Sequence, residues 1–191
     1  TPVWAESVYH PLAELAQFSR VNEQLEHRKQ HVYSTLQKEN IPLDFDVIIA
    51  RGGLLKPTPG GVYRITERIK SDLWNASMEH VSNLAALIAD DIAQRIGCPS
   101  FIADPVVTDE LQDVARLTGI PEIPRISIFH TLNSRAVSRR YAARIQKRYE
   151  DLNIIVVHLG GGISVSAHHY GRVIDVNNAL NGEGPFSPER A

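Results

Sequence analysis

The sequence predicts a mixed α/β fold in which strands alternate with helices and a unit of hairpin-connected strands follows. Residues 45–50, FDVIIA, are an apolar run without a polar face, typical of a strand inside a parallel sheet. Residues 80–96 carry leucine and isoleucine at helical spacing and end at Gly97, which predicts an amphipathic helix. Residues 154–176 predict strand, glycine loop, strand, tight turn and strand.

The other elements follow the same reasoning in chain order. Helices are expected where apolar residues recur at helical spacing, and strands where short apolar runs end at polar or proline residues. We predict a strand at 3–8, helices at 12–18 and 21–39, a hairpin at 54–66, a helix capped by Thr66, strands at 100–103 and 125–129, and a helix at 131–149. Asp109 and Glu110 are expected on a solvated helix, and the arginine-rich face of the helix at 131–149 is expected to be solvated too.

The composition is that of an ordinary globular protein. The chain has 191 residues, of which 43% are hydrophobic and 22% charged, with a net charge of -2. This balance does not indicate a nucleic-acid partner, and no apolar run is long enough to span a membrane. Cys98 is the single cysteine, so a disulfide framework is excluded, and we predict a cytoplasmic protein without a membrane partner.

Three consecutive glycines, Gly160, Gly161 and Gly162, interrupt the strands of the C-terminal region. Without side chains, their backbone N–H groups are open to a bulky anion. A dinucleotide-binding loop would need a helix next, and a Walker loop would need Gly-Lys-Ser/Thr; neither is present. A phosphate loop at the tip of a hairpin remains, flanked by His158 and Ser164. The alternative is an ordinary glycine-rich turn.

Charged residues follow several predicted strands, where open α/β sheets place their ligands. Arg51, Asp104 and His130 each come directly after such a strand. The alternatives are a surface arginine, a turn-capping aspartate before proline and a structural histidine. His80 and Asn83 share one face at the start of a predicted helix, where they could serve either polar packing or an anion site.

Three segments together carry a resemblance to a known family. HLGGGISV at 158–165, NNALNGEGPFSPER at 177–190 and RGGLLKPTPGG at 51–61 are similar to segments of the acetate and butyrate kinase family, within the sugar kinase, Hsp70 and actin superfamily. The chain departs from the family at Asn181, where aspartate is usual. It also departs near Arg51, because the acetate kinases carry their arginine a few residues earlier and a histidine before the two glycines.

The resemblance implies a ribonuclease H-like, actin-like ATPase fold with two lobes. Residues 1–150 would form the first, substrate-side lobe without its opening hairpin, and residues 151–191 would start the second, nucleotide-side lobe. The family's Asn-Pro-Gly-Ser-x-Ser phosphate loop is absent from the sequence. Because the chain starts at Thr1 without Met and stops in an open loop, we expect a longer protein, and we expect this chain alone to be inactive.

The implied reaction transfers the γ-phosphoryl group of ATP to the carboxylate of butyrate or a similar short-chain fatty acid, with Mg²⁺. The full-length enzyme would be a homo-oligomer. The implied roles fall into four groups: nucleotide phosphates would contact His158, Gly160, Gly161, Gly162 and Ser164; transferring charge would be stabilised by His130, Arg51 and Arg190; Mg²⁺ would be positioned by Asp104; and the substrate side would hold His80 and Asn83.

Two alternatives stay open at this stage. One is a kinase of the same family for another short or branched acid, because a single methylene changes binding by only about 1–3 kcal/mol. The other is a non-catalytic module that binds phosphate, nucleotide or a partner. A substrate series on the full-length protein distinguishes a butyrate kinase from a kinase for another acid. Measurable turnover distinguishes either kinase from a non-catalytic module.

Overall fold

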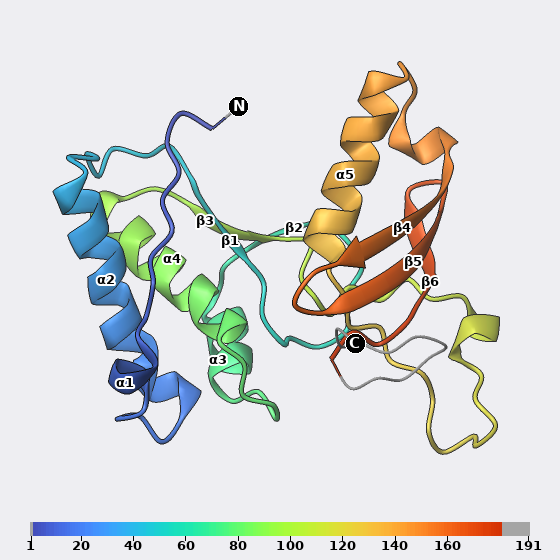
Figure 1. The fold of residues 1–191 in the computed structure, drawn as a ribbon, viewed down its shortest axis with the longest axis horizontal. Helices are drawn as coiled ribbons and strands as arrows, with labels where there is room; N and C mark the ends of the chain where they lie inside the picture. The colour runs from blue at the N-terminus through green and yellow to red at the C-terminus, as the bar shows by residue number, and fades with distance from the viewer. Residues whose placement is uncertain (1, 181–191) are drawn as a thin grey trace.

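Two three-stranded β-sheets, one formed by residues 48–103 and one by residues 153–176, organise the fold (Figure 1). The computed structural model describes residues 2–180. The strand order is β1-β3-β2 in the first sheet and β4-β5-β6 in the second. The strands are β1 (Ile48–Arg51), β2 (Val62–Arg64), β3 (Ser100–Ala103), β4 (Asn153–Leu159), β5 (Ile163–His169) and β6 (Arg172–Val176). Together with the helices they give the mixed α/β architecture that the sequence predicts.

The first sheet contains one parallel and one antiparallel pair. β1 runs parallel to β3, with Ile48 opposite Ser100, and β2 runs antiparallel to β3. The carboxyl ends of β1 and β3 therefore lie at the same edge of the sheet. This topology brings Arg51 and Asp104, which are far apart in the sequence, to neighbouring strand ends.

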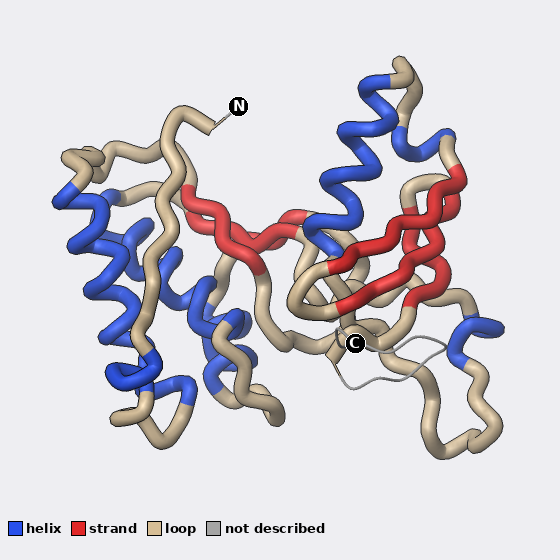
Figure 2. The backbone as a smooth tube through the Cα atoms, in the orientation of Figure 1, coloured by secondary structure: helices blue, strands red, loops and turns tan. Residues whose placement is uncertain are grey.

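Helices cover the first sheet on the side shown at the left of Figure 2. α4 packs against β1 and β3, and both α2 and α3 pack against α4. The helical elements here are α1 (Leu12–Leu15), the 3-10 helix η1 (Val21–Gln24), α2 (Leu25–Lys38), α3 (Glu67–Trp74) and α4 (Ser82–Ile96). The buried core between sheet and helices consists of Ile65, Leu73, Ala86, Ala89 and Ile102.

The ends of α3 and α4 follow local sequence signals. The Thr66 hydroxyl accepts a hydrogen bond from the Ile69 N–H at 3.3 Å and so caps α3. Gly97 ends α4 with a φ of 76°, a left-handed conformation that glycine adopts without steric cost. The predicted cap of α3 at Thr66 and the predicted end of α4 at Gly97 are both confirmed.

The second sheet is an antiparallel meander. Residues 160–162 connect β4 to β5, and Tyr170 and Gly171 connect β5 to β6. Both connecting residues of the second turn have positive φ, 47° and 81°, which suits the right-handed twist of a two-residue hairpin. The predicted order of strand, glycine loop, strand, turn and strand is confirmed.

α5 (Thr131–Arg144) packs against β4 and against the 3-10 helix η3 (Tyr149–Asp151). One face of β5 is buried and polar, since Ser164, Ser166 and His168 all have exposed fractions of 2% or less. The Tyr149 hydroxyl lies 2.6 Å from His168 Nδ1, and the Ser166 hydroxyl lies 2.8 Å from its Nε2, so this buried imidazole is satisfied on both sides.

Two predicted strands are not formed, and both predictions are wrong. Residues 3–8 have no regular secondary structure and are largely exposed. Residues 125–129 are also irregular. They are held by isolated backbone hydrogen bonds, in which the Phe129 N–H donates to the Val106 carbonyl and the Ile128 carbonyl accepts from the Ala179 N–H. An alternating apolar pattern marks a half-buried segment, but a strand also needs a continuous neighbouring strand.

The predicted helix with a solvated Asp109 and Glu110 is also wrong. Residues 105–112 form a loop that leads into the 3-10 helix η2 (Asp113–Arg116). Glu110 is only 8% exposed and accepts hydrogen bonds from the backbone N–H groups of Gly60 and Val173 at 2.9 and 2.8 Å. Asp109 receives two hydrogen bonds from Arg116, at 2.8 and 2.7 Å.

The arginine-rich face of α5 is not simply solvated either. Arg135 is 7% exposed and lies between two carboxylates, 3.2 Å from Glu110 and 3.3 Å from Asp104. Arg139 is also 3.3 Å from Asp104. The expected solvated face is therefore wrong for Arg135, because acidic residues that are distant in the sequence fold back onto the helix. Arg139 pairs with Asp104 but keeps a side chain that is 49% exposed.

Packing divides the described chain near residue 105. The first buried cluster belongs to the β1–β3 sheet, while a second cluster joins the second sheet to the segment before α5, through Leu111, Ala115, Phe129, Val173 and Val176. Residues 105–150 thus pack with β4–β6. The predicted lobes, 1–150 and 151–191, stay a prediction about domain organisation.

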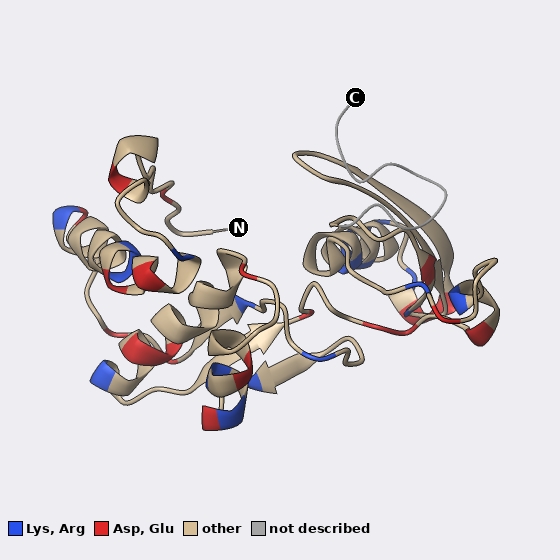
Figure 3. Cartoon of the chain, turned by 90° about the horizontal axis from the view of Figure 1, so that it is seen from below, with Lys and Arg blue, Asp and Glu red and all other residues tan. Residues whose placement is uncertain are grey.

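Charged residues of both signs are interspersed over the two parts of the molecule in the view of Figure 3. Basic residues do not gather on one face in that view. Within residues 2–180, no helix has the length and apolar character needed to cross a membrane.

Candidate active site

Two adjoining cavities lie where the ends of β1 and β3 face the start of α5 and the β4–β5 loop. Arg51, Val106 and His130 line both cavities. The larger cavity has a volume of about 610 Å³ and a mixed lining of polar, glycine and apolar residues. Beyond the shared three it is lined by Gly52, Asp104, Thr131, Leu132, Asn133, Ala136, His158, Gly161 and Gly162. The smaller, of about 110 Å³, is mainly apolar; beyond the shared three it is lined by Leu54, His80, Ile128, Phe129, Ala179 and Leu180.

Arg51 stands at the junction of the two cavities. It is the last residue of β1, its side chain is exposed, and Gly52 follows it against Pro105. Within residues 2–180 no carboxylate forms an ion pair with Arg51, in contrast to Arg135 and Arg139. A guanidinium without a carboxylate partner is suited to an anionic ligand.

His130 is held from two directions. Its Nδ1 lies 3.0 Å from the Ser164 hydroxyl, and its ring stacks on His158 with centroids 3.8 Å apart and planes 5° apart. Burial, followed by the nearby His158 and Arg51, lowers the pKa of His130 to about 4. The ring is therefore neutral at pH 7, and an arriving anion would favour its protonated form.

The tautomer of His158 follows from its partner. The Asn133 side-chain nitrogen lies 2.9 Å from His158 Nδ1, and an amide nitrogen can only donate. Nδ1 of His158 is therefore the acceptor, and a neutral ring carries its proton on Nε2. A Cβ atom at Gly160 would lie 2.8 Å from that Nε2, so the glycine leaves room for the ring.

The glycine loop presents open backbone to the larger cavity. The Gly160 N–H is used inside the loop, where it donates to the Gly162 carbonyl at 3.1 Å. Gly161 and Gly162 line the cavity, and a Cβ at Gly161 would meet nothing within 4 Å. The backbone at Gly161 is thus accessible to a bulky group such as a phosphate.

Asp104 combines an unusual backbone with a buried carboxylate. Its φ is 38°, a left-handed conformation uncommon for a residue other than glycine, and its N–H donates to the Gly61 carbonyl at 2.8 Å. Arg135 and Arg139 each lie 3.3 Å from the carboxylate, yet Oδ1 has no hydrogen bond within the described residues. Strained backbone with spare acceptor capacity is a feature of functional sites.

The other predicted site residues differ in their placement. His80 lines the smaller cavity, and its Nδ1 accepts from the Ser82 N–H at 3.2 Å, which leaves Nε2 as the donor of a neutral ring. Burial, then Arg51, lowers the pKa of His80. Asn83 lines neither cavity; its side chain accepts from the Leu54 N–H at 2.8 Å and donates to the Met78 carbonyl. Arg190 lies outside the described residues.

Ser164 also lies behind the cavities rather than in their walls. Its hydroxyl is fully buried beside His130 Nδ1, and we interpret it as a residue that orients the ring. A direct phosphate contact by Ser164 and a substrate-side role of Asn83 stay predictions. Sequence reasoning missed Asn133 and the apolar walls of the smaller cavity. Asn133 could have been found, because it lies one turn into the helix that His130 begins.

Replacing Ser164 by alanine should loosen the ring of His130. A hydrogen bond of this kind contributes about 0.5–1.5 kcal/mol, so we expect the ratio of the two neutral tautomers to change by about two- to tenfold. The ¹⁵N chemical shifts of the His130 ring measure that ratio. Ser166→Ala, which removes a hydroxyl from His168 instead, is the matched control; equal tautomer ratios in the parent protein and in Ser164→Ala would contradict the orienting role.

With this geometry established, comparisons with known proteins identify the class. Solved structures with the same fold include an acetate kinase from Entamoeba histolytica, with a TM-score of 0.61 and 16% identity over 86% of this chain and 46% of that chain. A propionate kinase from Francisella tularensis matches with a TM-score of 0.59 and 18% identity over 77% of this chain and 40% of that chain. The predicted actin-like ATPase fold is thereby confirmed.

Sequence comparison narrows the resemblance further. Residues 123–182 match the model of the acetokinase family. The chain is 69% identical over 190 residues to a protein from Phocaeicola vulgatus named probable butyrate kinase. The alignment covers 100% of this chain and 54% of the relative. It is 49% identical over 191 residues to butyrate kinase 2 of Clostridium acetobutylicum, covering 99% of this chain and again 54% of the relative.

The resemblance to the acetate and butyrate kinase family is thus confirmed along the whole chain. The two relatives that align over its length are named butyrate kinase. The chain spans about half the length of the relatives that it matches.

Proposed function

We propose that the full-length protein containing this chain is a kinase that transfers the γ-phosphoryl group of ATP to the carboxylate of butyrate or a similar short-chain fatty acid. The products are the acyl phosphate and ADP. The observation that carries the proposal is the junction of the two cavities. There, Arg51 and His130 stand between a small apolar cavity and a larger one lined by an open glycine loop.

The larger cavity suits the phosphates of the nucleotide. Open backbone at Gly161 and Gly162 offers N–H donors, and the neutral ring of His158 carries its proton on Nε2 because Nδ1 is the acceptor. These donors are uncharged, so they bind phosphate oxygens by hydrogen bonds. Arg51 adds the full positive charge at the end where the γ-phosphoryl group would lie.

Transfer between two anions requires charge stabilisation at the point of transfer. A carboxylate approaching a polyphosphate is repelled by it, and catalysis of phosphoryl transfer is mainly positioning and electrostatic stabilisation. Arg51 and His130 both line the two cavities. We assign to them the contacts with the transferring group, with Ser164 and His158 holding the ring.

The residues around Asp104 fit a Mg²⁺ ion. Asp104 lines the larger cavity and has a buried carboxylate oxygen without a hydrogen bond among the described residues. Mg²⁺ is commonly held by one or two carboxylates together with substrate phosphates and water. Asp104 would supply that carboxylate, directly or through water, and the bound ion would neutralise charge on the phosphates.

The smaller cavity suits a short acyl chain. Its walls are the apolar side chains of Leu54, Val106, Ile128 and Phe129, with Ala179 beside them, while its polar lining residues are Arg51, His80 and His130. An acid bound there would bury its hydrocarbon and present its carboxylate to the Arg51 guanidinium and the two imidazole rings. The volume of about 110 Å³ favours an acid of a few carbons.

Filling this cavity should change the acid preference. In Ala179→Val two added methyl groups occupy acyl space, so we expect kcat/KM for butyrate to fall by about 10–200-fold relative to that for acetate. Ala143→Val, on the exposed side of α5, is the matched control. An unchanged ratio of the two kcat/KM values in Ala179→Val would contradict the assignment of the acyl cavity.

The proposed reaction is tested by trapping acyl phosphate with hydroxylamine, using ATP, Mg²⁺ and a series of short-chain acids. The full-length protein should form hydroxamate with butyrate and with its near homologues in size. Absence of product with every short acid would overturn the kinase proposal and favour a binding module. Because the reaction needs intracellular ATP, we also propose a cytoplasmic location; homo-oligomerisation stays a prediction.

A further inference from the structure

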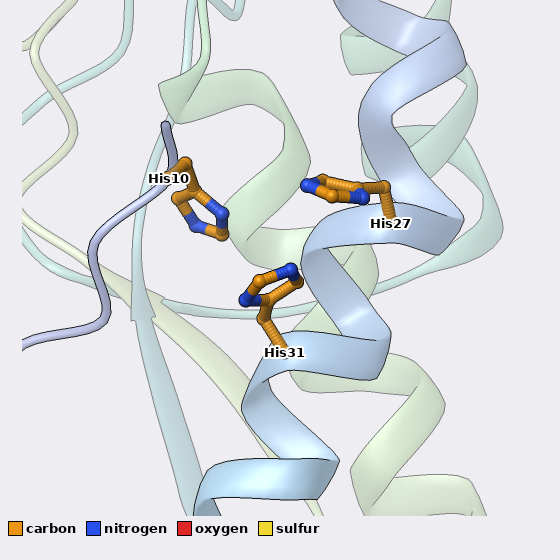
Figure 4. Close-up of side chains that lie close together, drawn as sticks. All are labelled: His10, His27 and His31. Atoms are coloured by element: carbon orange, nitrogen blue, oxygen red, sulfur yellow. The ribbon is translucent and has the colours of Figure 1, made fainter. Parts of the chain in front are cut away.

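Three histidines cluster between α2 and the segment that precedes α1, away from the cavities. His27 and His31 lie one turn apart on α2, and His10 comes from the irregular segment that precedes α1 (Figure 4). Their ring centroids are 4.5 Å apart for His27 and His31, 4.9 Å for His10 and His31, and 5.8 Å for His10 and His27. None of the three lines either cavity.

Metal-binding atoms converge in this cluster. One nitrogen from each of the three rings lies within 4.8 Å of the other two. Glu14 adds a carboxylate at the same place, with Oε2 at 3.5 Å from His27 Nε2 and 3.7 Å from His31 Nε2. Imidazole nitrogens and one carboxylate form a ligand set that zinc prefers. His27 and His31 are four residues apart on α2, so both point from the same face of the helix.

Two of the ring nitrogens are buried without a hydrogen bond. His10 Nδ1 and His27 Nε2 have no hydrogen bond among the described residues. Burying a polar atom without a partner costs free energy, so such atoms in a cluster point to a bound ligand.

Ordinary ring packing is the competing explanation, because Phe18 also lies 5.5 Å from His27. Packing alone explains tilted and edge-on ring contacts but not the convergence of one nitrogen from each ring. Ring packing also does not explain the position of the Glu14 carboxylate, which lies beside His27 Nε2 but forms no hydrogen bond with it. A metal ion would satisfy these atoms together.

We propose that His10, His27 and His31 bind a divalent transition metal ion, with zinc as the favoured metal and Glu14 or water as the fourth ligand. Zinc–nitrogen bonds of about 2.0–2.1 Å place tetrahedral ligand atoms about 3.3 Å apart, so small side-chain rotations would close the site. The site is structural: it ties the segment before α1 to α2. α1 itself has no buried residue, so the metal would strengthen the attachment of this end of the chain.

The test is a titration of the metal-free, tag-free full-length protein with Co²⁺, a spectroscopic substitute for zinc. The parent protein should bind one equivalent per chain with the strong visible absorption of tetrahedral Co²⁺, and zinc should displace it. His27→Asn and His31→Asn should each weaken Co²⁺ binding by at least about tenfold. Removing a residue that only hydrogen-bonds to a ligand already lowers metal affinity by about 10–100-fold, and removing the ligand itself should lower it at least as much.

Matched controls separate this site from other histidines. His169→Asn, at an exposed position on β5, and His130→Ala, in the cavities, should both retain the Co²⁺ spectrum. Thermal unfolding with and without zinc provides a second readout, because zinc should raise the midpoint of the parent and not of His27→Asn. Lack of a tetrahedral spectrum in the parent, or its persistence in His27→Asn and His31→Asn, would overturn the proposal.

Discussion

His130→Ala is expected to form acyl phosphate on the order of 10²–10³-fold more slowly than the parent protein, with the loss mainly in kcat. The imidazole lines both cavities and is held by Ser164 and His158, so it is positioned before the reactants arrive. An interaction that strengthens as charge develops on the transferring group contributes to kcat rather than to KM. Steady-state kinetics with saturating ATP and butyrate measure the effect.

The matched control is His169→Ala, an exposed histidine whose Nδ1 lies 2.6 Å from the Asn153 side chain. It should retain the parent rate. A rate for His130→Ala within about twofold of the parent would contradict the assigned role, provided that circular dichroism shows an intact fold.

The low pKa of His130 also predicts part of the pH dependence. Because the pKa lies at about 4, the ring stays neutral from pH 7 downward until pH approaches 4. His130 should therefore contribute no ionisation near pH 6.5 to kcat/KM, which reports groups of the free enzyme.

Glu110→Ala is expected to lower the free energy of unfolding by about 3–5 kcal/mol, the cost of removing one partner from a buried ion pair. Glu110 is buried and receives hydrogen bonds from Gly60, Val173 and Arg135, which belong to three separate parts of the chain. Its removal leaves a buried guanidinium with less compensation and two N–H groups without an acceptor. Urea denaturation measures the change.

Glu122→Ala is the control, since Glu122 is an exposed glutamate without an ion pair among the described residues. Its effect should stay within about 0.5 kcal/mol, as for most surface substitutions. A loss below about 1 kcal/mol in Glu110→Ala would mean that the buried network contributes little to the joining of the two sheets.

Local patterns predicted the parts of the fold that depend on local physics. Thr66 and Gly97 mark the ends of α3 and α4 because capping involves residues within one turn. The β4–β5–β6 meander follows from alternation and from turn residues at Tyr170 and Gly171. The same reasoning placed Arg51 and Asp104 at strand ends, and the parallel pairing of β1 and β3 then makes them neighbours.

Long-range pairing accounts for what the sequence could not reveal. Glu110 and Arg135 look like solvent-exposed charges in isolation, and only the fold shows that each is the other's buried partner. The smaller cavity draws its apolar walls from separate segments around Leu54, Val106, Ile128 and Ala179, so no single motif encodes it. The histidine cluster likewise needs His10 to approach α2 from outside the helix.

A crystal structure of the full-length protein with butyrate and a non-hydrolysable ATP analogue tests the central claim most directly. The account predicts the acyl chain among Leu54, Val106 and Ile128, with the carboxylate and the terminal phosphate meeting at Arg51 and His130. Density for the acid elsewhere, or a terminal phosphate remote from both residues, would contradict the assignment of these cavities as the site of phosphoryl transfer.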